Sequence, residues 1–223
     1  MTFCGSRLLL EDQARFGVLE DCLVAGCELG GMEFRRCQWR GVELREVTAP
    51  FLVFENADLR KLSVFRSSLS RLCMSSCVIA DTVFDGLVLI RSRWQGLKLR
   101  GLRLKSSCLQ RAQLRRVRAA SSSFTDFEAL ESRLEDCVFS GCLFNITYGS
   151  GMNGFSGALI KNCVFYGCRF SGFPLRGAAL ENCVFSGCSG EISGEPVNSG
   201  ARRKPLMRQV EAAKLLARIK ENL

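Results

Sequence analysis

The 223-residue sequence contains no histidine, only four prolines and no apolar run long enough to cross a bilayer. The absence of histidine removes the most common general base and metal ligand. No pair of carboxylates is placed where a concave site would bring the two groups together. Because Arg7, Glu11 and Asp12 interrupt the N-terminal segment, no signal peptide is expected either. We therefore expect no catalytic, cofactor-binding or metal site, and the chain is not expected to be an enzyme.

Apolar residues recur instead at every fifth position, from Leu9 to Phe144 without exception. A spacing of five cannot mark one face of a helix, because five steps of about 100° rotate the stripe by about 140° each time. It cannot mark one flat strand either, since positions on the same side of a strand are two apart. The chain must therefore turn a corner every five residues.

A second set of positions, two residues before each central one, is small or apolar. From Gly17 to Cys142 this set contains no charged residue. Positions two apart on an extended segment point to the same side, so both sets are predicted to face inward. An unpaired buried charge is too costly to recur, so the charged residues must face water. The repeating unit predicts a solenoid whose coils hydrogen-bond to the coils above and below.

This pattern resembles the pentapeptide-repeat family, with Ala57-Asp58-Leu59-Arg60-Lys61 as its best local match. The resemblance covers residues 4–190 and implies a right-handed, square-section β-solenoid with one pentapeptide on each side. The expected fold is all-β, with about nine coils over residues 1–188 and a C-terminal α-helix. At about 4.8 Å for each stacked strand the rod would be about 40 Å long, with a filled core. Serine in the second inward set fits, because its hydroxyl can bond nearby corner backbone.

One break interrupts the five-residue register. The copies Cys137-Val-Phe-Ser-Gly-Cys142, Cys163-Val-Phe-Tyr-Gly-Cys168 and Cys183-Val-Phe-Ser-Gly-Cys188 begin 26 and then 20 residues apart. Twenty residues make one coil, so the longer interval indicates six extruded residues. We place this loop at about residues 145–153. The G-x-G-x-x-G pattern from Gly149 to Gly154 lies in this loop and lacks the following helix that a nucleotide site requires.

The composition changes after Cys188. Residues 189–205 are rich in turn residues and indicate a linker that ends in Arg202, Arg203 and Lys204. Residues 206–223 are good helix formers, and their apolar positions cover more than half of the helix circumference. We expect this helix to cap the last coil and to join two chains in a homodimer. The candidate dimer-helix residues are Leu206, Val210, Ala213, Leu216, Ile219 and Leu223.

The sequence has thirteen cysteines, and ten of them occupy the small inward set. They are predicted to be free thiols that pack as small hydrophobic groups in a reducing compartment. We therefore expect a cytoplasmic protein. Export as an effector that needs no cleavable signal is left open by the same observations.

Charge is the feature that points towards a function. The chain carries 31 basic and 22 acidic residues, yet residues 86–125 contain ten basic residues and no acidic one. Forty residues span two coils, so we expect a positively charged belt near the middle of the rod. The basic belt, which we define to include Arg71 at the corner below it, consists of Arg71, Arg91, Arg93, Lys98, Arg100, Arg103, Lys105, Arg111, Arg115, Arg116 and Arg118.

These residues either keep the rod soluble or bind an anionic macromolecule. The sequence therefore predicts a non-enzymatic interaction protein that presents a rigid surface to a macromolecular partner, foremost a protein, and that takes no small-molecule substrate. The resemblance also includes the quinolone-resistance pentapeptide proteins, which imitate DNA and modulate DNA gyrase. DNA mimicry requires an acidic surface, so the belt counts against that alternative. A third alternative is a rod that binds RNA or an anionic membrane surface.

Overall fold

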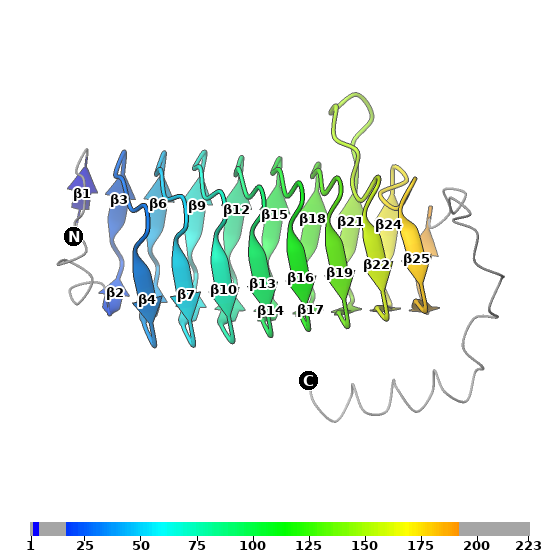
Figure 1. The fold of residues 1–223 in the computed structure, drawn as a ribbon, viewed down its shortest axis with the longest axis horizontal. Coiled ribbons are helices and arrows are strands. Elements are labelled where there is room, and N and C mark those ends of the chain that lie inside the picture. Colours follow the sequence, from blue (N-terminus) through cyan, green and yellow to red (C-terminus); the bar gives the residue numbers. More distant parts are fainter. Residues whose placement is uncertain (1, 5–16, 192–223) are drawn as a thin grey trace.

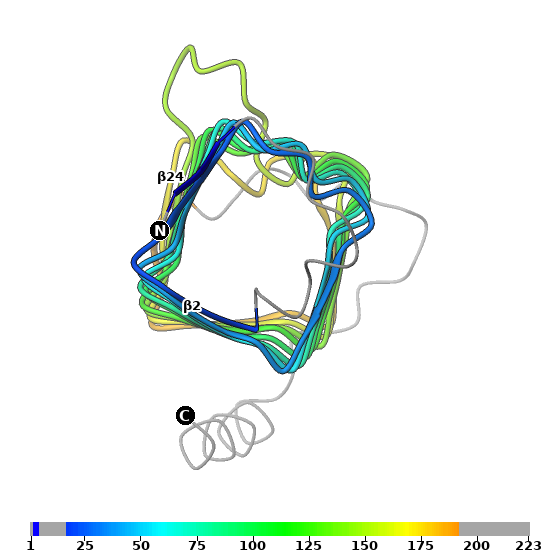
Figure 2. The ribbon, with the colours of Figure 1, turned by 90° about the vertical axis from the view of Figure 1, so that its left-hand side faces the viewer.

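The computed structural model describes residues 2–4 and 17–191, which form one all-β solenoid. The strands of successive coils run parallel and stack along a straight rod of about nine coils (Figure 1). Seen from the N-terminal end, each coil is a square, and the path turns clockwise as it recedes, so the solenoid is right-handed (Figure 2). The described residues contain no helix, and the linker from residue 192 and the predicted helix at 206–223 lie outside them.

Three sides of the square are continuous parallel sheets. The ten-stranded sheet consists of β1 (Thr2–Cys4), β3 (Leu23–Ala25), β6 (Glu43–Arg45), β9 (Ser63–Phe65), β12 (Val83–Asp85), β15 (Arg103–Lys105), β18 (Ser123–Thr125), β21 (Leu143–Asn145), β24 (Arg169–Ser171) and β27 (Ser189–Gly190). The nine-stranded sheet consists of β2 (Val18–Glu20), β5 (Gln38–Arg40), β8 (Asp58–Arg60), β11 (Val78–Ala80), β14 (Lys98–Arg100), β17 (Arg118–Ala120), β20 (Val138–Ser140), β23 (Val164–Tyr166) and β26 (Val184–Ser186). The eight-stranded sheet consists of β4 (Glu33–Arg35), β7 (Val53–Glu55), β10 (Cys73–Ser75), β13 (Arg93–Gln95), β16 (Gln113–Arg115), β19 (Arg133–Glu135), β22 (Leu159–Lys161) and β25 (Ala179–Glu181).

The fourth side has single bridges in place of strands. These parallel bridges join Glu28, Thr48, Ser68, Val88, Cys108, Glu128 and Gly154 in order. On all four sides, therefore, the backbone N–H and C=O groups of one coil form hydrogen bonds with those of the next, as the five-residue period predicts.

Both inward sets are buried as predicted. The central residue of every strand from β2 to β24 has little or no exposure, and from β3 to β24 so has the residue two positions before it. Aromatic rings stack along the axis in the C-terminal half, where Phe139, Phe165 and Phe185 lie in one column. Their ring centroids are 5.0 and 4.8 Å apart, with interplanar angles of 11° and 4°. Such stacked rings fill the core.

The inward serines use their hydroxyl groups to join coils. Ser107 Oγ accepts a hydrogen bond from the Leu87 backbone N–H at 3.1 Å and donates to the Lys105 carbonyl at 2.7 Å. Ser67 makes the equivalent bonds to Val47 and Phe65. The prediction that inward serines bond corner backbone is confirmed at these positions.

The register break is built as a loop that leaves the rod after β21 (Figure 1). Before it, strand partners are 20 residues apart, whereas Phe139 pairs with Phe165 and Phe144 pairs with Phe170, each 26 residues away. The loop is anchored where it leaves, because the Thr147 N–H and hydroxyl both donate to the Asp126 carboxylate, at 2.6 and 3.1 Å. Regular pairing resumes at Gly154.

Candidate interaction surface

The basic belt surrounds three of the four sides. Its side chains are all exposed. The nine-stranded sheet carries Lys98, Arg100 and Arg118, the ten-stranded sheet carries Arg103 and Lys105, the eight-stranded sheet carries Arg93 and Arg115, and the corners carry Arg71, Arg91, Arg111 and Arg116. The fourth side presents Val88 and Cys108 over the same two coils. The positive charge of the belt therefore faces three sides of the rod, and the fourth side is neutral over these two coils.

Only two of the ten basic residues between 86 and 125 form ion pairs with other described residues. Arg111 Nε lies 2.7 Å from Glu131 Oε2, and Arg115 Nε lies 3.8 Å from Glu135 Oε2. Both acidic partners sit one coil further along the rod, outside the 86–125 window. The other eight basic side chains make no ion pair with a described residue, so most of the positive charge is free to act on a partner.

The predicted stack of Arg71, Arg91 and Arg111 occupies a single corner. All three adopt positive φ angles, of 61°, 58° and 57°, and each backbone N–H bonds to a carbonyl of the next coil at 2.8 Å. The two ends of the stack have other partners, because the Arg71 guanidinium lies 4.8 Å from the centroid of the Phe51 ring and Arg111 pairs with Glu131. Repulsion between the stacked charges is thereby reduced at both ends.

The nine-stranded sheet presents the most uniform part of the belt. Lys98 and Arg118 are direct partners in adjacent strands, and Arg100 follows two residues after Lys98 on the same side. From β11 to β26 no outward position of this sheet is acidic. Those positions are Val78, Ala80, Lys98, Arg100, Arg118, Ala120, Val138, Ser140, Val164, Tyr166, Val184 and Ser186. Acidic groups lie only at its corners, at Asp81 and Asp136. The small neighbours Ala80 and Ala120 leave the three cationic side chains on a flat surface.

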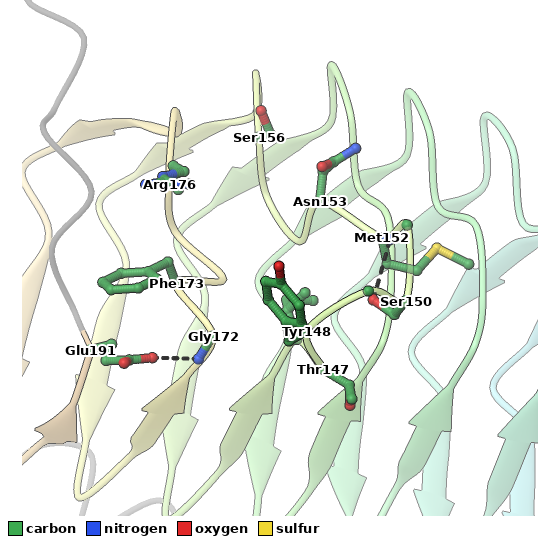
Figure 3. Close-up of a pocket in the computed structure, with 13 residues that line it drawn as sticks. Thr147, Tyr148, Ser150, Met152, Asn153, Ser156, Gly172, Phe173, Arg176 and Glu191 are labelled. Atoms are coloured by element: carbon green, nitrogen blue, oxygen red, sulfur yellow. Dashed lines mark hydrogen bonds between the residues drawn. The ribbon is translucent and has the colours of Figure 1, made fainter.

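A second surface feature lies beside the extruded loop. There the loop and the following coil enclose an open groove of about 510 Å³ (Figure 3). Tyr148 is fully exposed at its edge, and the Arg176 guanidinium lies 5.4 Å from the centroid of the Phe173 ring. The Glu191 carboxylate accepts a hydrogen bond from the Gly172 N–H (Figure 3). The groove combines one cation, one anion and two aromatic rings, but its charges are already engaged.

Sequence reasoning did not find this groove. Phe173 and Arg176 belong to the shifted register after the loop, where the chain forms a turn at 174–177 in place of a regular side. The signal available in the sequence was the aromatic residue at a corner with positive φ, a position that polar residues or Gly hold elsewhere in the described solenoid, except at Phe51. The loop motif from Gly149 to Gly154 is followed by turns and by β22, so it has none of the surroundings of a dinucleotide site.

Most of the cysteines in residues 17–191 are buried in the core, whereas Cys73 and Cys108 are partly exposed at outward positions. All twelve cysteines within residues 17–191 are free thiols. Burial raises the pKa of the Cys37 and Cys183 thiols to about 12 in each case. A hydrogen bond with the stacked Cys142 thiol, together with burial, also raises the pKa of Cys168. Protonated, buried thiols are poor nucleophiles and poor metal ligands. Within residues 17–191 no cluster of three or more potential ligands is arranged to hold a metal ion.

The repeat geometry identifies the fold. Each side of the square spans five residues, four sides complete a coil of 20, and the inward positions are the centre and the residue two before it. The chain has the pentapeptide-repeat fold. Within the described part of this pentapeptide-repeat solenoid, no helix is long and apolar enough to cross a bilayer.

Comparison of the sequence with protein-family models and with curated proteins found no match. Solved structures with similar folds include QnrB1, described as a plasmid-mediated fluoroquinolone resistance protein, at 14% identity and a TM-score of 0.41, covering 98% of this chain and 96% of that one. HetL, a pentapeptide-repeat protein involved in heterocyst differentiation regulation in the cyanobacterium Nostoc sp. strain PCC 7120, is 13% identical, with a TM-score of 0.25 over 81% of this chain and 92% of that one. The pentapeptide-repeat protein Rfr23 from the cyanobacterium Cyanothece 51142 is 14% identical, with a TM-score of 0.28 over 76% of this chain and 91% of that one. At these values no function is transferred from them.

Proposed function

We propose that this chain is a non-enzymatic interaction protein whose basic belt binds an acidic macromolecular partner. The observation that supports the proposal most directly is the set of eight exposed cations between residues 86 and 125 that make no ion pair with described residues. A rigid solenoid holds these charges in fixed positions. Binding therefore loses little backbone conformational entropy, and the main entropic cost is the ordering of the cationic side chains.

An acidic protein surface is the partner that fits this belt best. The cations of the nine-stranded sheet lie beside Val78, Ala80 and Ala120, so the surface offers apolar contact as well as charge. Single-stranded nucleic acid is bound largely by stacking of bases on exposed aromatic rings. Residues 86–125 offer none, because Trp94 and Phe124 are the aromatic residues there and both are buried. The exposed Phe51 ring beside the belt is already in contact with the Arg71 guanidinium.

A role in modulating DNA gyrase is less well supported. Among the neighbours in fold, the description of QnrB1 as a fluoroquinolone resistance protein suggests the idea. A protein that occupies a DNA-binding surface in place of DNA has to present negative charge to it. Here the middle of the rod is positive on three sides. Any contact with a topoisomerase would have to avoid the belt.

The assembly and location belong to the same proposal. The apolar residues Leu206, Val210, Ala213, Leu216, Ile219 and Leu223 are proposed to join two copies of the chain about a two-fold axis. Two copies would double the number of belts available to a partner and raise the avidity for a repeated acidic surface. The free thiols of the core are compatible with a cytoplasmic location.

The proposal is tested with four anionic probes offered to the full chain at low salt. These are poly-L-glutamate, duplex DNA, single-stranded RNA and vesicles that contain phosphatidylserine. Preferential binding of poly-L-glutamate is the expected result. Preference for RNA or vesicles would replace the acidic protein by the third alternative, and binding of no probe would contradict the proposal. Inhibition of gyrase supercoiling without binding of poly-L-glutamate would favour the topoisomerase role.

A further inference from the structure

Two valines on the outer face of the nine-stranded sheet are buried. Val164 in β23 and Val184 in β26 are only 3% and 7% exposed, although they flank the inward residue of their strands and point away from the core. At every other outward position of the strands from β2 to β25 the side chain is at least partly exposed. Val78, in the same column as Val164, is 38% exposed. The valine face, defined as Val138, Val164 and Val184, is therefore covered at its C-terminal end.

The end of the rod shows the opposite pattern. Leu180 in β25 is an inward residue of the last coil, and yet it is 36% exposed. The inward Phe185 in β26 is also partly exposed, whereas its outward neighbour Val184 is buried. The buried outward residues therefore lie on the side of the rod, whereas inward residues at its end are partly exposed.

Only one segment outside the described residues can reach this face. Residues 5–16 are tied at both ends to the first coil, by β1 pairing with β3 and by β2. β2 lies seven strands from β23, or about 34 Å at about 4.8 Å for each strand. Residues 192–205 begin beside β27 and can span up to about 46 Å when extended. They can therefore deliver the apolar segment 206–223 to Val164 and Val184.

We propose that residues 206–223 of the same chain lie along the nine-stranded sheet and cover the valine face. This placement differs from a cap over the last coil, and it is independent of the function proposed for the belt. The apolar residues of the segment supply the contact with Val164 and Val184, and the burial of both surfaces stabilises it. Because apolar residues cover more than one side of the segment, a second side stays available for another copy of the chain.

Charge limits how far along the sheet the segment can extend. Residues 192–223 contain seven basic and three acidic residues. Their net positive charge is repelled by Lys98 and Arg118, which lie on the same face one to two coils before Val138. The segment is therefore confined to the C-terminal part of the sheet. The cations of β14 and β17 remain open to solvent.

Thiol labelling of the full chain tests this placement. Val164→Cys and the matched Val78→Cys introduce an outward thiol in the same column, and peptide mass spectrometry separates them from the natural cysteines. The Val78→Cys protein should react with a maleimide at the rate of an exposed thiol. The Val164→Cys protein should react at least about tenfold more slowly, which corresponds to an opening free energy of about 1.4 kcal/mol. Equal rates would overturn the proposal.

A second pair of variants identifies the cover. Adding Leu216→Asp and Ile219→Asp to the Val164→Cys protein should raise its labelling rate to that of Val78→Cys. Adding Arg218→Asp, which changes a polar position of the same segment, should leave the thiol protected. Protection that survives both apolar changes would exclude residues 206–223. Protection that disappears on dilution would assign the cover to a second copy and would overturn placement within one chain.

Discussion

Lys98 in β14 and Arg118 in β17 are direct partners in adjacent coils, so two cations point outward from the same column of one sheet. Strands in a parallel sheet are about 4.8 Å apart, and like charges at such a separation repel each other. The β-solenoid fixes this spacing, because neither strand can shift without breaking the stack of inward side chains. The pair is stable in water through solvation and screening, and an acidic partner would stabilise it further.

The inward and outward assignments can be tested at neighbouring residues. Leu99 and Leu104 are buried, whereas Arg100 and Arg103 are exposed. Leu99→Arg or Leu104→Arg should abolish soluble expression, because an unpaired buried charge costs several kcal/mol against a total stability of about 5–15 kcal/mol. Arg100→Glu and Arg103→Glu should give soluble protein with an unchanged circular dichroism spectrum. Similar behaviour of the two pairs would contradict the assignment.

Two buried serines should respond oppositely to the same substitution. Ser107 accepts a hydrogen bond from the Leu87 N–H, so Ser107→Ala should lower the free energy of unfolding by about 1–3 kcal/mol. The Ser92 hydroxyl is buried and has no hydrogen-bond partner among residues 17–191, so Ser92→Ala should leave stability unchanged or raise it by up to about 1 kcal/mol. Urea denaturation measures both changes. A larger loss for Ser92→Ala than for Ser107→Ala would be inconsistent with the hydrogen bonds described.

The buried thiols should make stability depend on alkaline pH. Burial raises the pKa of Cys37 and of Cys183 to about 12 in the folded chain, from the ordinary thiol value of 9.0. The folded state therefore binds more protons than the unfolded state between these values, and the free energy of unfolding must fall as pH rises. This contribution is fully present below about pH 9. The free energy of unfolding should be measured by denaturation under reducing conditions at pH 8 and pH 10.5. Between these two pH values it should fall by less in Cys37→Ala than in the natural chain, whatever the difference between the two proteins at pH 8.

The proposed dimer makes a prediction about truncation. A chain that ends at Gly200 lacks all of the proposed dimer residues, so sedimentation equilibrium should show a monomer or non-specific aggregates. The full chain should sediment as a dimer under the same conditions. A truncated protein that remains dimeric would remove residues 206–223 from the interface. Whatever the oligomeric state, the valine face should be accessible in the truncated chain, which lacks residues 206–223, and protected in the full chain.

The solenoid could be predicted because its signal is local and repeated. Each five-residue unit separately reports which positions face inward, and the parallel all-β architecture with about nine coils is confirmed. The interval of 26 residues between two cysteine copies, compared with a coil of 20 residues, likewise predicted the length of the insertion. The chain from residue 192 onward, with the predicted helix, is outside the described residues. Its helical structure and its role in a dimer stay predictions.

The candidate site was predicted less completely, because partners in a solenoid are a whole coil apart. A window that ends at residue 125 shows no acidic neighbour for Arg111 or Arg115, although Glu131 and Glu135 are stacked against them. The window also could not show that one side of the square is neutral. The burial of Val164 and Val184 had no sequence signal, since valine is common at outward positions of strands. These features follow from which coils are adjacent, and therefore required the structure.

The central claim is that the belt on the nine-stranded sheet binds an acidic partner. The direct measurement is the affinity for fluorescent poly-L-glutamate of the natural chain and of two triple variants with the same net charge. One combines Lys98→Gln, Arg100→Gln and Arg118→Gln in the belt. The control combines Arg35→Gln, Arg45→Gln and Arg66→Gln, whose natural side chains are paired with glutamates in the N-terminal half.

We predict that binding by the natural chain weakens about tenfold or more between about 50 and about 200 mM salt, as screening of several charge pairs requires. At low salt the belt variant should lose most of the affinity, and the control variant should keep most of it. Binding that is independent of salt, or equal losses in the two variants, would contradict the claim and leave the belt residues with the role of keeping a narrow rod soluble.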